Sequence, residues 1–179
     1  MEMKGSRQIA APRAVVWAAL NDAEVLKAAI PGCQSLTGSP EEGFSAIVKQ
    51  KVGPVSATFE GQVRLNDVVP LESYTIAGEG KGGAAGFAKG QAAVALADGE
   101  DGATLLTYDV KANVGGKLAQ LGSRLIDGFA KKMADTFFEN FAVAVEPPAE
   151  APAGGASDGE AEGGEKKAGW FRRITGRGA

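Results

Sequence analysis

The sequence predicts an α+β fold in which a curved antiparallel sheet wraps around one long C-terminal helix, followed by a disordered tail. Three observations support this prediction. Apolar residues alternate with period two between Phe44 and Val114, and they recur at steps of three and four between Leu118 and Phe141. After Val145 the composition changes abruptly to small and acidic residues. We therefore assign residues 1–145 to the folded domain.

Two short helices are expected near the N-terminus, after a short strand over residues 3–10. Ala11 and Pro12 open the first helix, since proline is favoured at the first helical position. Asn21 and Asp22 precede the second helix as N-capping residues, and Pro31-Gly32 ends it.

About six antiparallel strands follow. The clearest one covers residues 55–65, where Phe59 belongs to the apolar set and Glu60 to the polar set. The segment Asp98–Gly102 is a hairpin signal. The other runs lie at residues 44–48, around Tyr74 and Ile76, and at 92–96 and 106–114.

Residues 117–145 are predicted to form one helix that covers the apolar face of the sheet. A strongly curved sheet around one helix leaves space between them, so we expect an apolar pocket suited to a lipophilic ligand, with two tyrosine hydroxyls as its polar groups. The alternative is a core filled by side chains. The candidate pocket residues are Phe59, Tyr74, Tyr108, Leu121, Leu125, Phe129, Met133 and Phe137.

Composition excludes several kinds of catalytic site. The chain has no histidine and one cysteine, Cys33, so it has neither a histidine-based triad nor a histidine-ligated zinc site. A net charge of −3 argues against nucleic-acid binding. The segment 78–83 matches a dinucleotide-binding fingerprint in letters only, since a strand pattern follows it where that motif needs a helix. We expect no catalytic residues, no metal ligands and no covalent cofactor.

Residues 146–165 are predicted to be a disordered linker, with six acidic residues and no basic one. Residues 166–179 carry five basic residues together with aromatic ones, a composition typical of a weak membrane anchor selective for anionic lipid. The alternative is a C-terminus without function. The expected membrane-contacting residues are Lys166, Lys167, Trp170, Phe171, Arg172, Arg173 and Ile174.

The polar N-terminus is unlike a signal peptide, and no run of eighteen apolar residues occurs. We therefore expect a cytoplasmic protein, peripheral on the inner face of the cytoplasmic membrane.

Taken in order, several short motifs of the chain resemble the family of the carbon monoxide dehydrogenase G subunit, within the START-like (SRPBCC) superfamily. The matching pieces are Ala11-Pro12 with Val16-Trp17, Ile30–Cys33, Val52–Val55, Phe59–Gly61, the glycine-rich hairpin Gly78–Gly90, and Val114–Ile126. Together they extend through most of residues 1–145.

The resemblance implies a helix-grip fold and an accessory role beside a cytoplasmic molybdenum hydroxylase, typically carbon monoxide dehydrogenase. It also implies membrane attachment of that enzyme and handling of the respiratory quinone, menaquinone or ubiquinone, that accepts its electrons. Two alternatives stay open: a recruitment module without a ligand, and a small enzyme, such as a cyclase or hydrolase, on the same fold.

Overall fold

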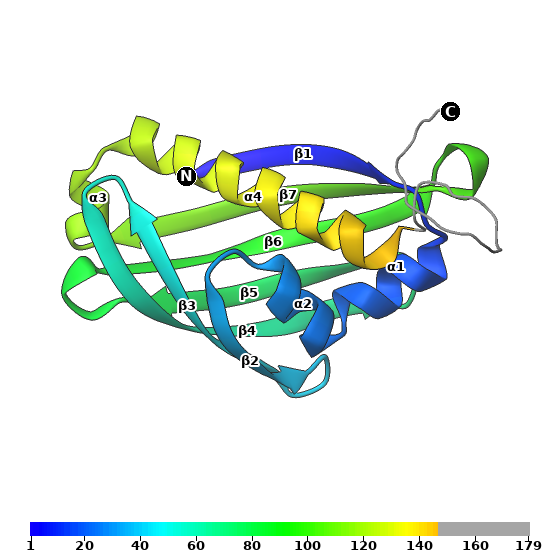
Figure 1. Cartoon of the computed structure of the whole chain (residues 1–179), viewed down its shortest axis with the longest axis horizontal. Coiled ribbons are helices and arrows are strands. Elements are labelled where there is room, and N and C mark those ends of the chain that lie inside the picture. The colour runs from blue at the N-terminus through cyan, green and yellow to red at the C-terminus, as the bar shows by residue number, and fades with distance from the viewer. Residues whose placement is uncertain (147–179) are drawn as a thin grey trace, which may run out of the picture. The chain divides into compact units, whose positions relative to one another are not determined.

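Seven antiparallel strands form one curved sheet, and a long C-terminal helix lies along one of its faces (Figure 1). The computed structural model describes residues 1–146, and Met1–Glu146 form one compact unit. The strands are β1 (Glu2–Ile9), β2 (Cys33–Ser39), β3 (Gly43–Val52), β4 (Val55–Val69), β5 (Ser73–Lys81), β6 (Phe87–Asp98) and β7 (Thr104–Gly115). The helices are α1 (Arg13–Leu20), α2 (Ala23–Ala29), α3 (Lys117–Gln120) and α4 (Ser123–Val145), with short 3₁₀ turns at Gly83–Ala85 and Glu100–Gly102. The predicted α+β class with a curved antiparallel sheet and a C-terminal helix is confirmed.

The strand order is β1-β7-β6-β5-β4-β3-β2. Strands β2 to β7 therefore form a meander in which each strand pairs with the next one along the chain. The first strand, β1, pairs instead with the last, from Glu2 opposite Lys111 to Ile9 opposite Thr104. The first and the last strand of the domain thus lie side by side at one edge of the sheet.

The two short N-terminal helices begin where the sequence predicts. Pro12 is the N-cap of α1, in an extended conformation that suits the residue before a helix. At α2 the Asp22 carboxylate accepts a hydrogen bond of 2.8 Å from the amide of Glu24, which satisfies one of the free donors of the first turn. Helices α1 and α2 lie beside the C-terminal part of α4 (Figure 1).

The predicted helix over residues 117–145 is wrong in one respect, because two helices occupy this segment. Gly122 has φ +91° and ψ 155°, a conformation that ends α3 and that side chains other than glycine rarely adopt. Leu121 is therefore the C-cap of α3 and does not belong to α4. The structure also contains a strand, β2, in a segment for which we expect none.

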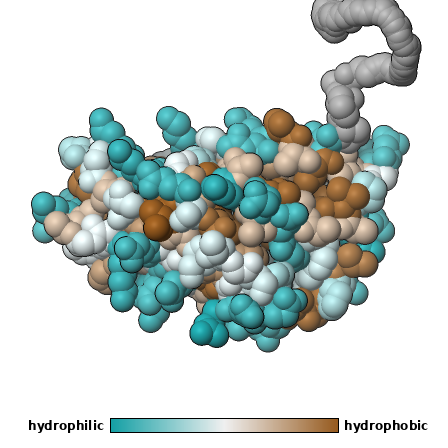
Figure 2. All heavy atoms as spheres, turned by 60° about the horizontal axis from the view of Figure 1, so that its bottom comes forward, coloured by the Kyte–Doolittle hydropathy of each residue, from teal (hydrophilic) through white to brown (hydrophobic). Residues whose placement is uncertain are grey.

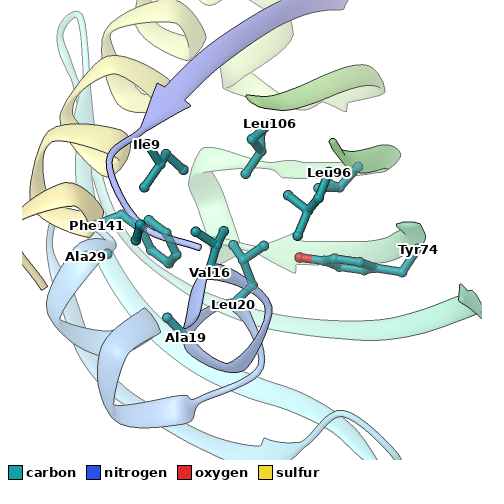
Figure 3. Close-up of a cluster of buried hydrophobic side chains, with 11 residues drawn as sticks. Ile9, Val16, Ala19, Leu20, Ala29, Tyr74, Leu96, Leu106 and Phe141 are labelled. Carbon is teal, nitrogen blue, oxygen red and sulfur yellow. The ribbon is translucent and has the colours of Figure 1, made fainter. Parts of the chain in front are cut away.

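A closely packed apolar cluster lies where α1 and the C-terminal end of α4 meet the sheet (Figure 3). Val16 and Phe141 are fully buried there, and Leu106 of β7 is 1% exposed. The buried hydroxyl of Thr104 donates a hydrogen bond of 2.7 Å to the carbonyl of Ala11, which ties β7 to the start of α1. This end of the molecule is filled by side chains, and the functional site lies beyond it along α4.

Candidate functional site

An apolar cavity of about 670 Å³ lies between the inner face of the sheet and α4. Side chains from most of the strands, from α2 and from α3 contribute to its wall, together with one face of α4. Almost all of the lining groups are aliphatic or aromatic. A space of this size and character matches the binding sites of small lipophilic molecules.

Small residues at inward positions explain why the cavity is not filled. On α4 the lining includes Ala130 and Ala134, one turn apart, so this part of the helix presents methyl groups to the sheet. Opposite it the strands present glycines and alanines at positions where larger side chains would close the space. The small lining residues of the strands are Ala46, Gly61, Gly80, Ala88 and Ala112.

Six of the eight predicted pocket residues line this cavity: Phe59, Tyr74, Tyr108, Phe129, Met133 and Phe137. The other two, Leu121 and Leu125, do not. Leu121 is at the break between α3 and α4, and Leu125 is 40% exposed. A Cβ atom placed on Gly53 would lie 2.7 Å from Leu125 Cδ2, so this leucine covers the β3–β4 turn.

The inner face of α4 is broader than the single row that the sequence analysis selected. Ile126, Ala130, Ala134 and Phe138 also line the cavity, one position after each predicted residue. In the sequence these apolar residues recur at steps of four, but the prediction selected only one row of the helix surface and left this second row out. From the strands, sequence reasoning missed Phe44, Val63, Ile76 and Val110 among others.

Tyr74 lies at the packed end of the cavity and is 4% exposed. Its ring meets that of Trp17 edge to face, with 5.3 Å between the centroids. Figure 3 shows its hydroxyl directed toward Leu20 and Val16. Burial raises the pKa of Tyr74, because the charged phenolate would lose its solvation there. This phenol is therefore a neutral group in an apolar environment.

Tyr108 lies on the β1 side of the cavity, with its ring stacked on Phe138 of α4 at 5.5 Å between centroids. A Cβ atom on Gly5 would clash with the Tyr108 hydroxyl oxygen, at well under 3.0 Å. Gly5 is thus the residue of β1 that makes room for the phenol, and any larger residue would displace it.

Arg7 stands two residues after Gly5 and was not selected from the sequence. The burial pattern of β1 alternates so that Met3, Gly5, Arg7 and Ile9 are its more buried positions. The Arg7 guanidinium forms an ion pair with Asp135 of α4 and lies over the Phe138 ring, 5.2 Å from its centroid. It is a charged residue at an inward position of β1.

Arg7 and Asp135 form a charge-assisted pair, and each shifts the pKa of the other. The hydrogen bond from Arg7 lowers the pKa of Asp135, an effect that partial burial opposes and that Lys131, 3.4 Å from Asp135, reinforces. The same contact with Asp135 raises the pKa of Arg7, and the nearby Tyr108 phenol adds to this shift. Both groups therefore keep their charges at neutral pH.

A polar crevice of about 390 Å³ between β1 and α4 adjoins the apolar cavity. The two spaces share Met1, Met3, Tyr108 and Ala130 as lining residues. The crevice also contains Arg7, Lys131 and Asp135, together with Lys4 and Asp127. The site thus changes from apolar to charged at Tyr108.

The outer surface has a different character from the cavity. In Figure 2 polar atoms cover much of the visible face, and hydrophobic atoms occur in separate areas between them. The larger exposed apolar residues include Val15, Val68, Val69 and Leu71. On the visible face the apolar atoms are thus interrupted by polar ones, whereas the lining of the cavity is almost entirely apolar.

Other groups singled out in the sequence show no catalytic arrangement within the described domain. Cys33 is half-buried, and burial raises the pKa of its thiol, which disfavours the reactive thiolate. The glycine-rich segment 78–83 leads through a short 3₁₀ turn into β6, as a bent hairpin does. Within residues 1–146 no three acidic or cysteine residues are grouped as metal ligands would be.

The predicted linker beyond Glu146 and all of the expected membrane-contacting residues, Lys166, Lys167, Trp170, Phe171, Arg172, Arg173 and Ile174, lie outside the described residues. In the part that the structure describes, none of the helices combines the length and the hydropathy of a membrane-spanning segment.

A family model matches residues 5–146, which is nearly all of the described domain, and it describes CoxG, the G subunit of carbon monoxide dehydrogenase. Among curated protein sequences, none matches significantly. The family resemblance stated from the sequence motifs is therefore confirmed over these residues.

Solved structures agree with this fold. A conserved protein from Geobacillus kaustophilus is 29% identical, with a TM-score of 0.76 over 81% of this chain and 95% of that one. A protein from Chromobacterium violaceum is 16% identical, with a TM-score of 0.60 over 82% of this chain and 99% of that one. A protein from Thermus thermophilus is 14% identical, with a TM-score of 0.60 over 81% of this chain and 97% of that one. The last two likenesses concern the fold alone.

Proposed function

Since the chain belongs to the CoxG family of carbon monoxide dehydrogenase subunits, we propose that it is a non-catalytic accessory protein of a carbon monoxide dehydrogenase or a related molybdenum hydroxylase. Its domain is then a helix-grip domain of the START-like superfamily. Its task is to hold a lipophilic molecule, a respiratory quinone such as menaquinone or ubiquinone, and so to link the enzyme to the respiratory chain.

The observation that carries this proposal is the apolar cavity of about 670 Å³. Burying apolar surface of a ligand contributes roughly 25 cal/mol per Å², so a quinone ring with part of its isoprenoid chain gains several kcal/mol on entering such a space. A domain whose only task is recruitment needs no such space, and larger side chains at Ala130 and Ala134 would have closed it.

Little in the cavity supports catalysis by the domain itself. Its lining offers two phenols and the amide of Gln50, whose nitrogen donates to the carbonyl of Pro31. The nearby charges of Arg7 and Asp135 neutralise each other. Cyclase or hydrolase chemistry needs a base or nucleophile aimed at the substrate, so the binding role is the better supported one.

The second part of the proposal concerns the membrane. We assign the basic-aromatic segment 166–179 to weak attachment at an anionic membrane surface on the cytoplasmic side, on its composition alone. This would bring a cavity that binds a membrane-soluble quinone close to the quinone pool.

Lipid extraction of the purified full chain, followed by mass spectrometry, tests the carrier function. We expect a quinone at near-stoichiometric amount, and we expect added decylubiquinone to raise the melting temperature because it binds only the folded state. Ala134→Leu places extra carbon atoms inside the cavity and should weaken quinone binding about ten-fold or more, since overpacking of this kind costs about 1–3 kcal/mol. Ala28→Leu adds the same atoms on the exposed side of α2 and serves as the matched control.

Absence of any extracted lipid, together with an unchanged melting temperature at saturating quinone, would contradict the carrier function. The recruitment module would then be the better explanation of the family membership.

A further inference from the structure

The apolar cavity adjoins a charged crevice on its β1 side, and this polar boundary orients an amphiphilic ligand. Tyr74 is at the packed end, where burial in the apolar cluster surrounds it with Leu20 and Val16. Tyr108 lies in the same cross-strand row, since both tyrosines are paired with Val94, but on the β1 side, where the cavity adjoins the charged crevice between β1 and α4. A polar head group placed at Tyr108 keeps access to charge and solvent, whereas at Tyr74 it would lose both.

The groups at Tyr108 are arranged as hydrogen-bond donors. A guanidinium has donors only, so Arg7 favours the phenol oxygen of Tyr108 as an acceptor and leaves the phenol proton for another partner. The Arg7 Nε–H is buried and has no hydrogen-bond partner among the described residues. A buried donor without an acceptor is costly, and an oxygen of a ligand would relieve that cost.

The position of these donors is held by neighbouring residues. Asp135 pairs with the guanidinium, and Phe138 lies against both Arg7 and Tyr108. Gly5 leaves the space that the phenol occupies. Lys131 in turn lies 3.4 Å from Asp135. The side chains lining the crevice carry three positive charges, on Lys4, Arg7 and Lys131, and three negative charges, on Glu2, Asp127 and Asp135, so they balance without a ligand carboxylate. A neutral acceptor, such as a carbonyl oxygen, therefore fits better than an anion.

We infer that Tyr108 and Arg7 bind the carbonyl oxygen of the ligand at the β1–α4 boundary, with the apolar chain lying in the cavity between the sheet and α4. This inference rests on the proposed carrier function and adds to it the orientation of the ligand and the residues that recognise its polar end. The recognised class is an uncharged lipophilic molecule with a carbonyl-type acceptor at one end.

Two probes with the same alkyl chain test the inference: decylubiquinone, which has carbonyl oxygens, and decylbenzene, which has none. Their affinities for the full chain are measured by equilibrium partition and extraction. Tyr108→Phe should weaken decylubiquinone binding about five-fold, the loss expected for one neutral hydrogen bond, and should leave decylbenzene binding unchanged. Tyr74→Phe removes the same atom from the other phenol of the cavity and should change the affinity ratio of the two probes little.

A second measurement does not depend on affinity. The carbonyl stretching band of bound decylubiquinone, recorded by infrared difference spectroscopy, should lie at lower frequency in the wild-type protein than in Tyr108→Phe. The pair Arg7→Met with Asp135→Asn removes both charges of the inward ion pair together and leaves only the exposed Lys131 without its partner, and it should shift the same band in the same direction as Tyr108→Phe.

The possible results distinguish the carrier function from the inferred orientation of the ligand. If neither probe binds the wild-type chain, both the carrier function and the orientation are overturned. If both probes bind but Tyr108→Phe affects neither or affects them equally, the carrier function stands and the orientation is wrong. A selective loss of decylubiquinone in Tyr74→Phe would place the polar end at the packed end of the cavity and would also overturn the inference.

Discussion

At the scale of single residues, the site depends on which inward positions lack a side chain. Gly5 and Gly61 both occupy inward positions of strands, but their surroundings differ. A Cβ atom on Gly5 would clash with the Tyr108 hydroxyl, whereas one on Gly61 would find its nearest neighbour, the Glu79 carbonyl oxygen, at 3.7 Å. The first glycine accommodates a phenol, and the second borders open space in the cavity.

We therefore expect opposite outcomes for the same substitution at these two positions. Gly5→Ala should lower the free energy of unfolding by about 1–3 kcal/mol, the usual cost of overpacking, because the Tyr108 ring has to move. Gly61→Ala should leave it unchanged or raise it by up to about 1 kcal/mol, since alanine restricts the unfolded chain. Urea unfolding of both variants measures this, and equal stability of the two would contradict the assigned position of the Tyr108 ring.

At this scale, the two tyrosines of the cavity could be predicted from the sequence, but the neighbouring Arg7 could not. Tyr74 and Tyr108 were expected in the pocket because both belong to an apolar period-two set, and both line the cavity. Arg7 was not expected, because a charged residue in a strand pattern indicates the solvent face by default. Only its ion-pair partner Asp135, far away in the sequence, makes an inward arginine tolerable, and periodicity carries no information about such a pair.

At the scale of secondary-structure elements, the helical segment after β7 has two parts because of one glycine. Gly122 has φ +91°, and no heavy atom would lie within 4 Å of a Cβ placed there. Glycine is therefore required at position 122 by the backbone conformation and not by neighbouring atoms. Gly128, within α4, is equally open around its Cα but has no such backbone requirement. The hydrophobic row from Leu118 to Phe141 crosses this break, which is why the sequence pattern suggests one helix.

These two glycines form a matched pair for a test of the break. Gly122→Ala should lower the free energy of unfolding by about 1–3 kcal/mol, since alanine is strained at this positive φ. Gly128→Ala should raise it by roughly 1 kcal/mol, because alanine is the better helix former. Thermal or urea unfolding of each variant measures these changes in the free energy of unfolding. A stabilising effect at Gly122 would mean that α3 and α4 form one continuous helix in solution.

At the scale of elements, prediction succeeded where one physical rule dominated. The cap at Asp22 and the alternation in β4 are local signals, and both elements are present. The strand β2 was missed because Cys33–Ser39 has few large apolar residues, and its pairing with β3 includes a register shift between Cys33 and Ser35. The exact face of α4 was also set by tertiary packing, since Phe137 and Phe138 both pack inward and meet edge to face at 5.1 Å.

At the scale of the whole molecule, the proposal joins a ligand-binding domain to a membrane-contacting segment. The domain accounts for residues 1–146, and its charged residues lie both on its strands and on its helices. The segment 166–179 combines five basic residues with Trp170 and Phe171. Attachment through so few apolar groups is weak and reversible, and the basic residues make it depend on anionic lipid.

Co-sedimentation with vesicles of phosphatidylcholine and phosphatidylglycerol tests this attachment. The full chain should sediment with the vesicles and should bind less as the salt concentration rises, because screening weakens the attraction of exposed charges. A chain ending at Glu146 should keep a cooperative unfolding transition but lose the sedimentation. Arg172→Glu with Arg173→Glu should abolish the preference for anionic lipid. Equal sedimentation of the full and the shortened chain would place the membrane contact on the domain.

The pairing of β1 with β7 also has a consequence for the order in which the protein folds. Strands β2 to β7 join neighbours through short turns, but Glu2 and Lys111 come together only after more than a hundred residues of chain have been brought into place. Closing so long a loop costs more entropy than forming a hairpin, so we expect β1 to dock late, onto a meander that is already formed. Arg7 and Gly5 are on that strand. The polar boundary of the cavity would then be completed last in folding and would be the first part to open under mild denaturation, while Ile9 at the other end of β1 stays held in the packed cluster around Phe141.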